Sequence, residues 1–465
     1  MSTDTLVNGF TLINPSTEDE IKEYEYMTML EAEKVVENCH AAFRDWRLQS
    51  LEHRANIIKN IGTKLGEHKD EFVRLMTDEM GKTRKQGAQE IDLCIATCEY
   101  TAQKGQEILK DEERDLPEGG KGVISYSPTG VIYGIQPWNF PAYQAVRYSI
   151  ANLMAGNGVL LKHAENVTGS ALLLQKIYEE AGLPKNLFSV LIIDHEQSDE
   201  IIKNDLVRGV TLTGSPKAGK IVAEKAAAVL KKTVLELGSN DAYIVFDDAD
   251  LELAVQACVT GRIYNNGETC VAAKRFIVVE ERYDDFKKAF IKAMRDVKMG
   301  DPTDESTDFG PMARKDLRDK LHDQVIESVE KGATVLLGGT IPEKKGFFYP
   351  ATILENIEPG QPAYDDELFG PVASLIKAKN NHDALKIAND SKYGLGGGIF
   401  SKNEEKAFEM AKKYFDTGMV FINSFGLAQP NMPFGGVKES GYGREHGGFG
   451  IREFVNAKSV MKVKM

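Results

Sequence analysis

The stretch GVTLTGSPKAGKIV, residues 209–222, runs from an apolar segment through a glycine loop into a segment of helical character. Within it, Gly214, Gly219 and Lys220 nearly reproduce the nucleotide-triphosphate loop G-x-x-x-x-G-K-[ST]. The stretch therefore raises three alternatives: an ATP site, a dinucleotide site, or only a tight turn.

Both consensus phosphate motifs fail at single positions of this loop. Ile221 stands where the triphosphate loop needs a hydroxyl for magnesium, and Lys217 stands where a dinucleotide fingerprint needs its central glycine. What remains is a strand that leads into a helix N-terminus, where free N–H groups attract phosphate. Taken alone, the loop leaves ligand binding open.

Around this stretch, short apolar runs alternate with helical periodicity, which is typical of crossover units on a parallel sheet. The predicted strands are 158–161, 187–193, 207–213 and 233–237, and the predicted helices are 167–181 and 217–230. The preceding region, 28–114, has apolar residues three and four apart and is predicted to be helical. The tail REFVNAKSVMKVKM, 452–465, is predicted to be an edge strand, paired with another subunit or within the chain.

Bulk composition narrows the functional class. A chain of 465 residues with 42% hydrophobic and 27% charged residues is expected to form two or three globular domains. Its formal net charge of −13 disfavours nucleic-acid binding, which needs a basic surface. The sequence contains no signal-peptide pattern and no apolar run of about 18 residues, so no membrane partner is expected.

The five cysteines are too few and too scattered for a disulfide framework, which favours a reducing, cytoplasmic location. Cys94 and Cys98 lie one helical turn apart, but no further cysteine or histidine cluster accompanies them. We interpret them as helix core residues and expect no metal site.

Seven motifs give the chain a family resemblance. In order, they are GIQPWNFP (134–141), LKHAE (161–165), TGS (213–215), LELGSND (235–241), NNGETC (265–270), DELFGPV (366–372) and PFGGVKESGYGRE (433–445). Together they resemble the NAD(P)-dependent aldehyde dehydrogenase superfamily over nearly the whole chain, and the bacterial succinate-semialdehyde dehydrogenases most of all.

The resemblance implies an α/β fold with an open parallel-sheet cofactor domain, an α/β catalytic domain and a small β oligomerisation element. Residues 1–237 are expected to form the cofactor domain, with a β-hairpin oligomerisation element near 115–130. The catalytic domain is expected at 238–437, and 438–465 is expected to return to the cofactor domain and end in an oligomerisation edge strand. A homodimer or a homotetramer is implied.

The resemblance also implies how the reaction is carried out. Cys270 matches the nucleophile, and a thiolate suits this role because it attacks carbonyl carbon and later leaves from a thioester. Asn139 matches the amide that binds the oxyanion, together with the backbone N–H of Cys270. Glu236 matches the general base that activates water for thioester hydrolysis.

For the cofactor, the resemblance implies NAD, with NADP as an alternative. Glu165 falls where a carboxylate accepts from the adenosine 2′-hydroxyl and repels a 2′-phosphate, and Lys162 matches the lysine that binds the same ribose. Glu367 and Phe369 match residues that hold the nicotinamide ribose and ring. The implied cofactor contacts are completed by Pro137, Trp138, Gly214, Ser215 and Leu237.

Two arginines suggest the substrate class. Arg147 and Arg275 match positions at which succinate-semialdehyde dehydrogenases bind the distal carboxylate, and a guanidinium suits a carboxylate because it binds in two-pronged geometry. Ala428 departs from a serine common at the third contact, which leaves the substrate's chain length open. Ser239 replaces the second glycine of the usual LELGG.

The predicted function is therefore oxidation of succinate semialdehyde, or of a near ω-carboxy aldehyde, to the diacid through a cysteine thioester. Three alternatives remain at this point. They are a broad aldehyde dehydrogenase without carboxylate preference, an inactive binding protein on the same fold, and an ATP-using enzyme, which Ile221 disfavours.

Overall fold

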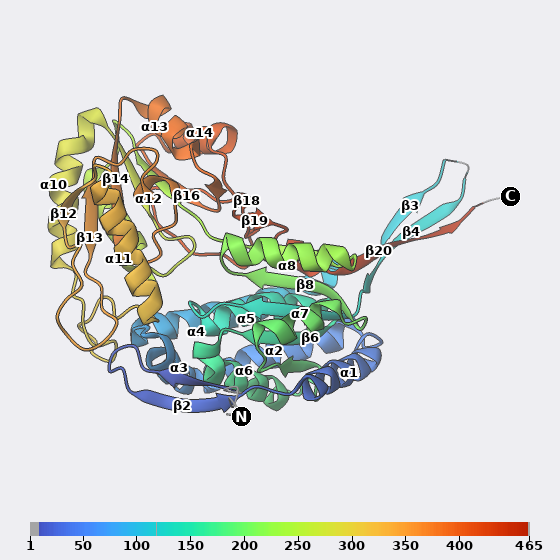
Figure 1. Ribbon diagram of the computed structural model, residues 1–465. Coiled ribbons are helices and arrows are strands. Elements are labelled where there is room, and N and C mark those ends of the chain that lie inside the picture. Colours follow the sequence, from blue (N-terminus) through green and yellow to red (C-terminus); the bar gives the residue numbers. More distant parts are fainter. Residues whose placement is uncertain (1–8, 118, 464–465) are drawn as a thin grey trace.

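Two large sheets organise the chain in the computed structural model, which describes residues 9–117 and 119–463 (Figure 1). The first sheet has the strand order β19-β9-β8-β5-β6-β7, and its strands are parallel except for β19 at one edge. Its strands are β5 (Val131–Gln136), β6 (Gly158–His163), β7 (Phe188–Val190), β8 (Val207–Thr213), β9 (Lys232–Glu236) and β19 (Gly441–Tyr442).

The second sheet has the order β12-β13-β14-β11-β10-β16-β17, with only β12 antiparallel. Its strands are β10 (Ala242–Val245), β11 (Arg275–Val279), β12 (Thr334–Leu337), β13 (Thr352–Glu355), β14 (Val372–Ala378), β16 (Gly397–Phe400) and β17 (Phe421–Ile422). The predicted α/β class with largely parallel sheets is confirmed.

Helices cover both faces of the first sheet. The helices here are α1 (Met29–Trp46), α2 (Leu51–Glu67), α3 (Lys69–Met80), α4 (Arg84–Ile108), α5 (Pro141–Ala155), α6 (Thr168–Glu180), α7 (His195–Lys203) and α8 (Pro216–Ala228). Apolar side chains of α1, α7 and α8 pack on one face, and α5 and α6 pack on the other with α2 and α4 behind them.

The amphipathic spacing predicted for the N-terminal region is seen in α1. Its buried residues recur every three or four positions: Ala32, Val36, Cys39, Phe43 and Trp46. A capping box between Thr28 and Glu31 satisfies the N–H groups that a helix start leaves free.

Helix α5 is buried along its whole length, because it crosses between β5 and β6 inside the helical layer. Pro141 begins it and Gly156 ends it in the left-handed conformation, φ 95°. This helix places the residues that follow β5 at the carboxyl edge of the sheet.

The second sheet is covered in the same manner. Apolar side chains of α9 (Leu251–Ile263) and α10 (Glu280–Asp296) pack on one face, and those of α11 (Lys315–Glu330), α13 (Asn381–Asn389) and α14 (Glu404–Tyr414) pack on the other. The short helices are α12 (Pro362–Asp365) and α15 (Phe449–Glu453).

Smaller antiparallel elements complete the fold. β1 (Gly9–Ile13) pairs with β2 (Glu20–Glu25), and β15 (Tyr393–Gly394) pairs with β18 (Val437–Lys438). The tail forms β20 (Val455–Lys462), which pairs along its whole length with β4 (Lys121–Pro128), and β4 pairs in turn with β3 (Glu112–Asp115). This ribbon extends away from the two-sheet body (Figure 1).

The ribbon contains the expected hairpin near 115–130, of which residue 118 lies outside the described residues. The tail strand pairs within the chain, and in the described chain β20 is an edge strand of its sheet. In the described part of the chain, no helix is long and apolar enough to cross a membrane.

The predicted elements of the first sheet match the structure closely, except at one strand. Strand 187–193 is shorter than predicted, since β7 ends at Val190. Beyond it, the backbone leaves the sheet edge, and the carbonyl of Ile192 accepts from the N–H of Met27 at 2.8 Å.

Gly134 in β5 gives a test of the packing between sheet and helix. A Cβ at this position would lie 2.2 Å from the ring of Tyr148, a buried residue of α5 whose hydroxyl donates to the carbonyl of Leu160. Gly134→Ala should therefore cost about 1–3 kcal/mol through overpacking, and a lower thermal midpoint would show it. Gly214→Ala is the matched control, because a Cβ there meets only Leu212 atoms at 3.7 Å and beyond. Equal midpoints for the two variants would contradict this packing argument.

Candidate active site

A cleft of about 390 Å³ lies at the carboxyl ends of the parallel strands of the first sheet. On the side of the first sheet it is lined by Thr213, the last residue of β8, and by the loops after β5, β8 and β9, which contribute Pro137, Trp138, Asn139, Gly214, Ser215, Leu237 and Gly238. From the other side it is lined by Cys270, Glu367, Phe369, Tyr393 and residues of α11. Ligands of open parallel sheets bind at this edge.

Residues 214–219 form the start of α8 and do not form a triphosphate-binding loop. The Ser215 hydroxyl accepts from the N–H of Ala218 at 3.2 Å and caps α8. The Lys220 ammonium pairs with Glu439 at 2.8 Å on the surface, so it does not reach into the cleft. Gly219 packs against Leu237, since a Cβ there would lie 2.6 Å from that side chain.

Cys270 is held by the turn NNGETC, which has an unusual backbone. Asn265 and Asn266 adopt left-handed conformations with φ 54° and 59°, followed by Gly267 at φ 76°. A Cβ at Gly267 would lie 2.4 Å from the backbone of Gly370, so this position requires glycine. Burial raises the pKa of the Cys270 thiol to about 12, against the opposing charges of Arg147 and Lys274.

Asn139 is tied directly to the cysteine turn. Its side-chain Nδ2 donates to the carbonyl of Glu268 at 3.0 Å, and its own carbonyl accepts from Asn265 Nδ2 at 2.8 Å. Asn139, in the loop after β5, and Cys270, in the loop before β11, line the same cleft.

A buried ion pair that the sequence reasoning missed supports Asn139 from behind. The Lys82 ammonium bonds Glu90 and donates to the Asn139 carbonyl at 2.9 Å. The Glu90 carboxylate also accepts from the N–H groups of Ala142 and Tyr143 at 2.8 and 2.9 Å, which caps α5. Lys82 precedes the N-cap of α4 and Glu90 lies inside this helix, so no helical spacing in the sequence marks the two as a pair.

Glu236 is the last residue of β9 and precedes the cleft residue Leu237. Both of its carboxylate oxygens are buried and lack a hydrogen-bond partner among the described residues. Burial first, and then the neighbouring charge of Glu445, raise the pKa of this carboxyl well above its ordinary value. A base with a raised pKa and free oxygens is suited to accept a proton.

A second cavity, of about 500 Å³, extends the site toward the first helix layer. It is lined by Lys162, Glu165 and the first residues of α11, while later residues of α11 line the main cleft. Glu165 accepts from the Tyr26 hydroxyl at 2.5 Å. The two cavities thus lie along the carboxyl ends of the strands of the first sheet and along α11. This arrangement fits an extended dinucleotide with its diphosphate near the start of α8.

Aromatic and acidic residues line the main cleft beside Cys270. Trp138, in the loop after β5, and Phe369, in the loop before β14, meet edge-on with ring centroids 5.8 Å apart. Glu367 accepts from the N–H of Ser239 at 3.0 Å and lies 3.2 Å from the Lys274 ammonium.

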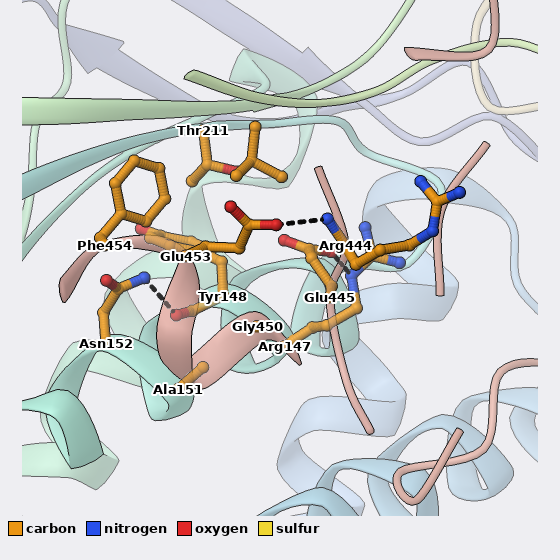
Figure 2. Close-up of a pocket in the computed structure, with 11 residues that line it drawn as sticks. Arg147, Tyr148, Ala151, Asn152, Thr211, Arg444, Glu445, Gly450, Glu453 and Phe454 are labelled. Atoms are coloured by element: carbon orange, nitrogen blue, oxygen red, sulfur yellow. Dashed lines mark hydrogen bonds and ion pairs between the residues drawn. The ribbon is translucent and has the colours of Figure 1, made fainter. Parts of the chain in front are cut away.

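Arg147 lies behind the cleft wall, in α5. Figure 2 shows its guanidinium directed at Glu445, with which it forms a buried ion pair. It also donates to the Thr213 hydroxyl at 3.2 Å, and Thr213 lines the main cleft. The cavity drawn in Figure 2 is only about 10 Å³, which has room for about one water molecule and is too small for a substrate.

Arg275, the second arginine expected to contact a substrate carboxylate, lies at a helix end outside the main cleft. Arg275 begins β11, and its guanidinium donates to the backbone carbonyls of Asn240, Ile387, Ala388 and Asp390 at 2.8–3.3 Å. Three of these carbonyls lie at the end of α13, where helix carbonyls lack their usual i+4 donors. This arginine therefore stabilises a helix terminus, and it does not line the main cleft.

Comparison with known proteins agrees with this architecture. The sequence profile described as "Aldehyde dehydrogenase family" matches residues 2–460. The chain is 42% identical to the succinate semialdehyde dehydrogenase [NAD(P)+] Sad of Escherichia coli over 450 residues, 97% of each chain. It is 39% identical to the succinate-semialdehyde dehydrogenase [NADP(+)] of Deinococcus radiodurans over 451 residues, 97% of this chain and 94% of the relative.

Solved structures give the same result. Succinic semialdehyde dehydrogenase from Streptococcus pyogenes, in complex with NADP+, superposes with a TM-score of 0.95 at 36% identity, covering 98% of this chain and 100% of that one. Betaine aldehyde dehydrogenase from Staphylococcus aureus, in complex with NAD+, has a TM-score of 0.94 at 30% identity, covering 98% and 92%. The chain belongs to the aldehyde dehydrogenase family, and it is an aldehyde dehydrogenase.

The burial of the cysteines predicts how the thiols react. Cys39, Cys94, Cys98 and Cys258 are fully buried, whereas Cys270 is partly exposed in the cleft. Iodoacetamide should therefore modify one thiol per chain in the native protein, as counted by mass spectrometry, and none in Cys270→Ala. Because the Cys270 thiol has a raised pKa, the rate should keep rising with pH through pH 7–10. Rapid labelling of a second cysteine, or a rate that levels off near pH 7, would contradict this description.

Proposed function

We propose that this enzyme oxidises succinate semialdehyde, or a near ω-carboxy aldehyde, to the dicarboxylate with NAD(P)+. The observation that carries the proposal is the convergence of the Cys270 thiol and the Asn139 amide in one cleft, with the buried Arg147 guanidinium directly behind its Thr213 wall. Full-length relatives named succinate-semialdehyde dehydrogenases support the same substrate class.

In the proposed reaction, the Cys270 thiolate adds to the aldehyde carbon and forms a thiohemiacetal. The Asn139 amide and the backbone N–H of Cys270 stabilise the oxyanion, and each such donor contributes about 10²–10³ in rate. A bound nicotinamide dinucleotide supplies the hydride acceptor. Collapse of the oxyanion then leaves an acyl group on Cys270 as a thioester.

Glu236 is proposed to complete the reaction by taking a proton from the water that attacks the thioester. The carbon–sulfur bond breaks, the acid leaves and Cys270 returns as thiolate. Because the pKa of Glu236 is raised, the carboxyl is protonated at low pH and becomes a base only as the pH rises. Both this step and thiolate formation therefore favour alkaline pH.

The cofactor is proposed to lie along the two cavities, with the adenosine ribose at Lys162 and Glu165 and the nicotinamide half between Trp138, Glu367 and Phe369. The Glu165 carboxylate suits a 2′-hydroxyl and repels a 2′-phosphate, which favours NAD+. The names of several relatives specify NADP+, so both cofactors belong in the test.

The substrate carboxylate is proposed to be bound by Arg147 alone of the two arginines. Arg147 already pairs with Glu445, so the substrate would share or replace that carboxylate. Ala428 is buried and supplies no hydroxyl, which leaves the substrate's chain length open between four carbons and a near homologue.

The contacts that Arg147 and Arg275 make within the chain also favour a second candidate function, a broad aldehyde dehydrogenase without carboxylate preference. The Arg147 guanidinium is already paired with the Glu445 carboxylate, and the Arg275 guanidinium already donates to backbone carbonyls. Neither guanidinium lines the main cleft among the described residues.

A substrate panel separates these two functions. Succinate semialdehyde, glutarate semialdehyde and an uncharged aldehyde of equal length should each be assayed with NAD+ and with NADP+. We expect kcat/KM to favour the carboxylated aldehydes about tenfold or more, because a charge-assisted hydrogen bond contributes about 1.5–3 kcal/mol. Equal kcat/KM for charged and uncharged aldehydes would support the broad enzyme instead.

A variant pair assigns the preference to Arg147. Removing either residue alone would leave the other charge buried and unpaired, at a cost of about 3–5 kcal/mol, so the comparison uses the Glu445→Gln background, in which the second substitution leaves neither charge. Adding Arg147→Gln to it should lower kcat/KM for the semialdehyde about tenfold or more, with little change for the uncharged aldehyde. Similar losses on both aldehydes would mean that Arg147 serves the fold.

A further inference from the structure

Below Cys270, a buried cluster connects the nucleophile to the residue proposed to hold the nicotinamide ribose. Its centre is Lys274, four residues after Cys270, whose side chain is 2% exposed. The Lys274 ammonium lies 2.5 Å from the Cys270 carbonyl and 3.2 Å from the Thr269 carbonyl. A buried lysine is costly unless its donors are satisfied, and here two of its acceptors belong to the nucleophile's own turn.

Ser239 is the second member of the cluster. Its hydroxyl accepts from the Lys274 ammonium at 3.0 Å and donates to the Cys270 carbonyl, so lysine and serine converge on one oxygen. The Ser239 hydroxyl thus links the Lys274 ammonium to the backbone of Cys270.

Glu367 is the third member, and it faces the cleft. Its Oε1 lies 3.2 Å from the Lys274 ammonium and accepts from the backbone N–H of Ser239 at 3.0 Å. Asp241 is the remaining carboxylate near the lysine. It accepts from the N–H of Gly396 at 3.0 Å, and burial raises its pKa to about 6.

We propose that Lys274 is a positioning residue that binds the backbone of the nucleophile and the cofactor-facing carboxylate of Glu367 at once, placing a positive charge beside Cys270. The Glu367 part of this proposal rests on the proposed function, whereas the contacts with Cys270 do not. Four charged groups act on the Cys270 thiol: Arg147 and Lys274 lower its pKa, and Glu367 and Asp241 raise it.

The two partners of the Lys274–Glu367 pair must then act on the thiol in opposite directions. Removing the lysine charge leaves less thiolate at a given pH, and removing the glutamate charge leaves more. A purely structural role predicts no such opposition, because loosening the cluster would expose the thiol in both cases. The opposite signs are therefore the diagnostic readout.

The experiment measures iodoacetamide alkylation of Cys270 in the full-length protein at pH 8, without aldehyde. Lys274→Met should slow alkylation about threefold, because tenfold less thiolate is partly offset by the higher nucleophilicity of a more basic thiolate. Glu367→Gln should accelerate it by a similar factor. Lys287→Met and Glu355→Gln are matched controls, since this pair has the same charges, 2.8 Å apart, in the same half of the chain. Neither control should change the rate.

Turnover separates this inference from the proposed function. With any aldehyde that the wild type oxidises, Lys274→Met should lower kcat about tenfold or more, while Glu367→Gln should mainly raise KM for the cofactor despite its more reactive thiol. If both variants shift alkylation in one direction, or Glu367→Gln leaves it unchanged, the inference is overturned while the proposed function stands. If Lys274→Met fails to fold, the alkylation rate of Glu367→Gln alone tests the inference, which requires that rate to rise above the wild-type rate. A wild type that oxidises no aldehyde refutes the proposed function and leaves the alkylation result intact.

Discussion

The hydrogen bonds between the Asn139 loop and the cysteine turn are the constraint on which the site depends. Asn139 follows a strand of one sheet and residues 265–268 precede Cys270 in the other half of the chain, and two amide contacts of 3.0 and 2.8 Å join them. This junction fixes the Asn139 amide relative to the Cys270 turn. The left-handed backbone of the turn at 265–267 is tolerated because the surrounding contacts fix it.

Buried charge is concentrated around this junction. Lys82 and Glu90 hold the Asn139 loop, Arg147 and Glu445 lie behind the Thr213 wall, and Lys274 lies under Cys270. A buried ion pair is weak as a source of stability, because desolvation offsets most of the attraction. These buried charges instead hold the Asn139 loop, the Thr213 wall and the Cys270 backbone at defined positions in the site.

Much of this arrangement could be predicted from the sequence, because it depends on local pattern. The alternation of apolar runs and helices predicts the first sheet, and β8 has the bounds expected for 207–213. The family motifs predict residues that the structure brings together in one cleft, including Cys270, Asn139 and Glu367.

The rest depends on contacts between distant segments, which no local pattern carries. Lys82 lies 57 positions before the carbonyl that it binds, so its role appears only once α4 packs beside α5. Arg275 shows the converse: its position suggested a substrate contact, but the carbonyls at the end of α13, more than 110 positions away, occupy its donors. Which groups satisfy a guanidinium is a property of the folded chain.

Cys270 is proposed to carry the acyl group between oxidation and hydrolysis. Mass spectrometry of Glu236→Gln tests this role after the variant is mixed with an aldehyde that the wild type oxidises and with NAD+, or with NADP+ if that is the working cofactor. Because the side-chain amide of this variant cannot take the proton from water, we expect a thioester to accumulate on the peptide containing Cys270, with about one equivalent of reduced cofactor per chain. An acyl group on another residue, or reduced cofactor released without any acylated Cys270, would contradict the claim.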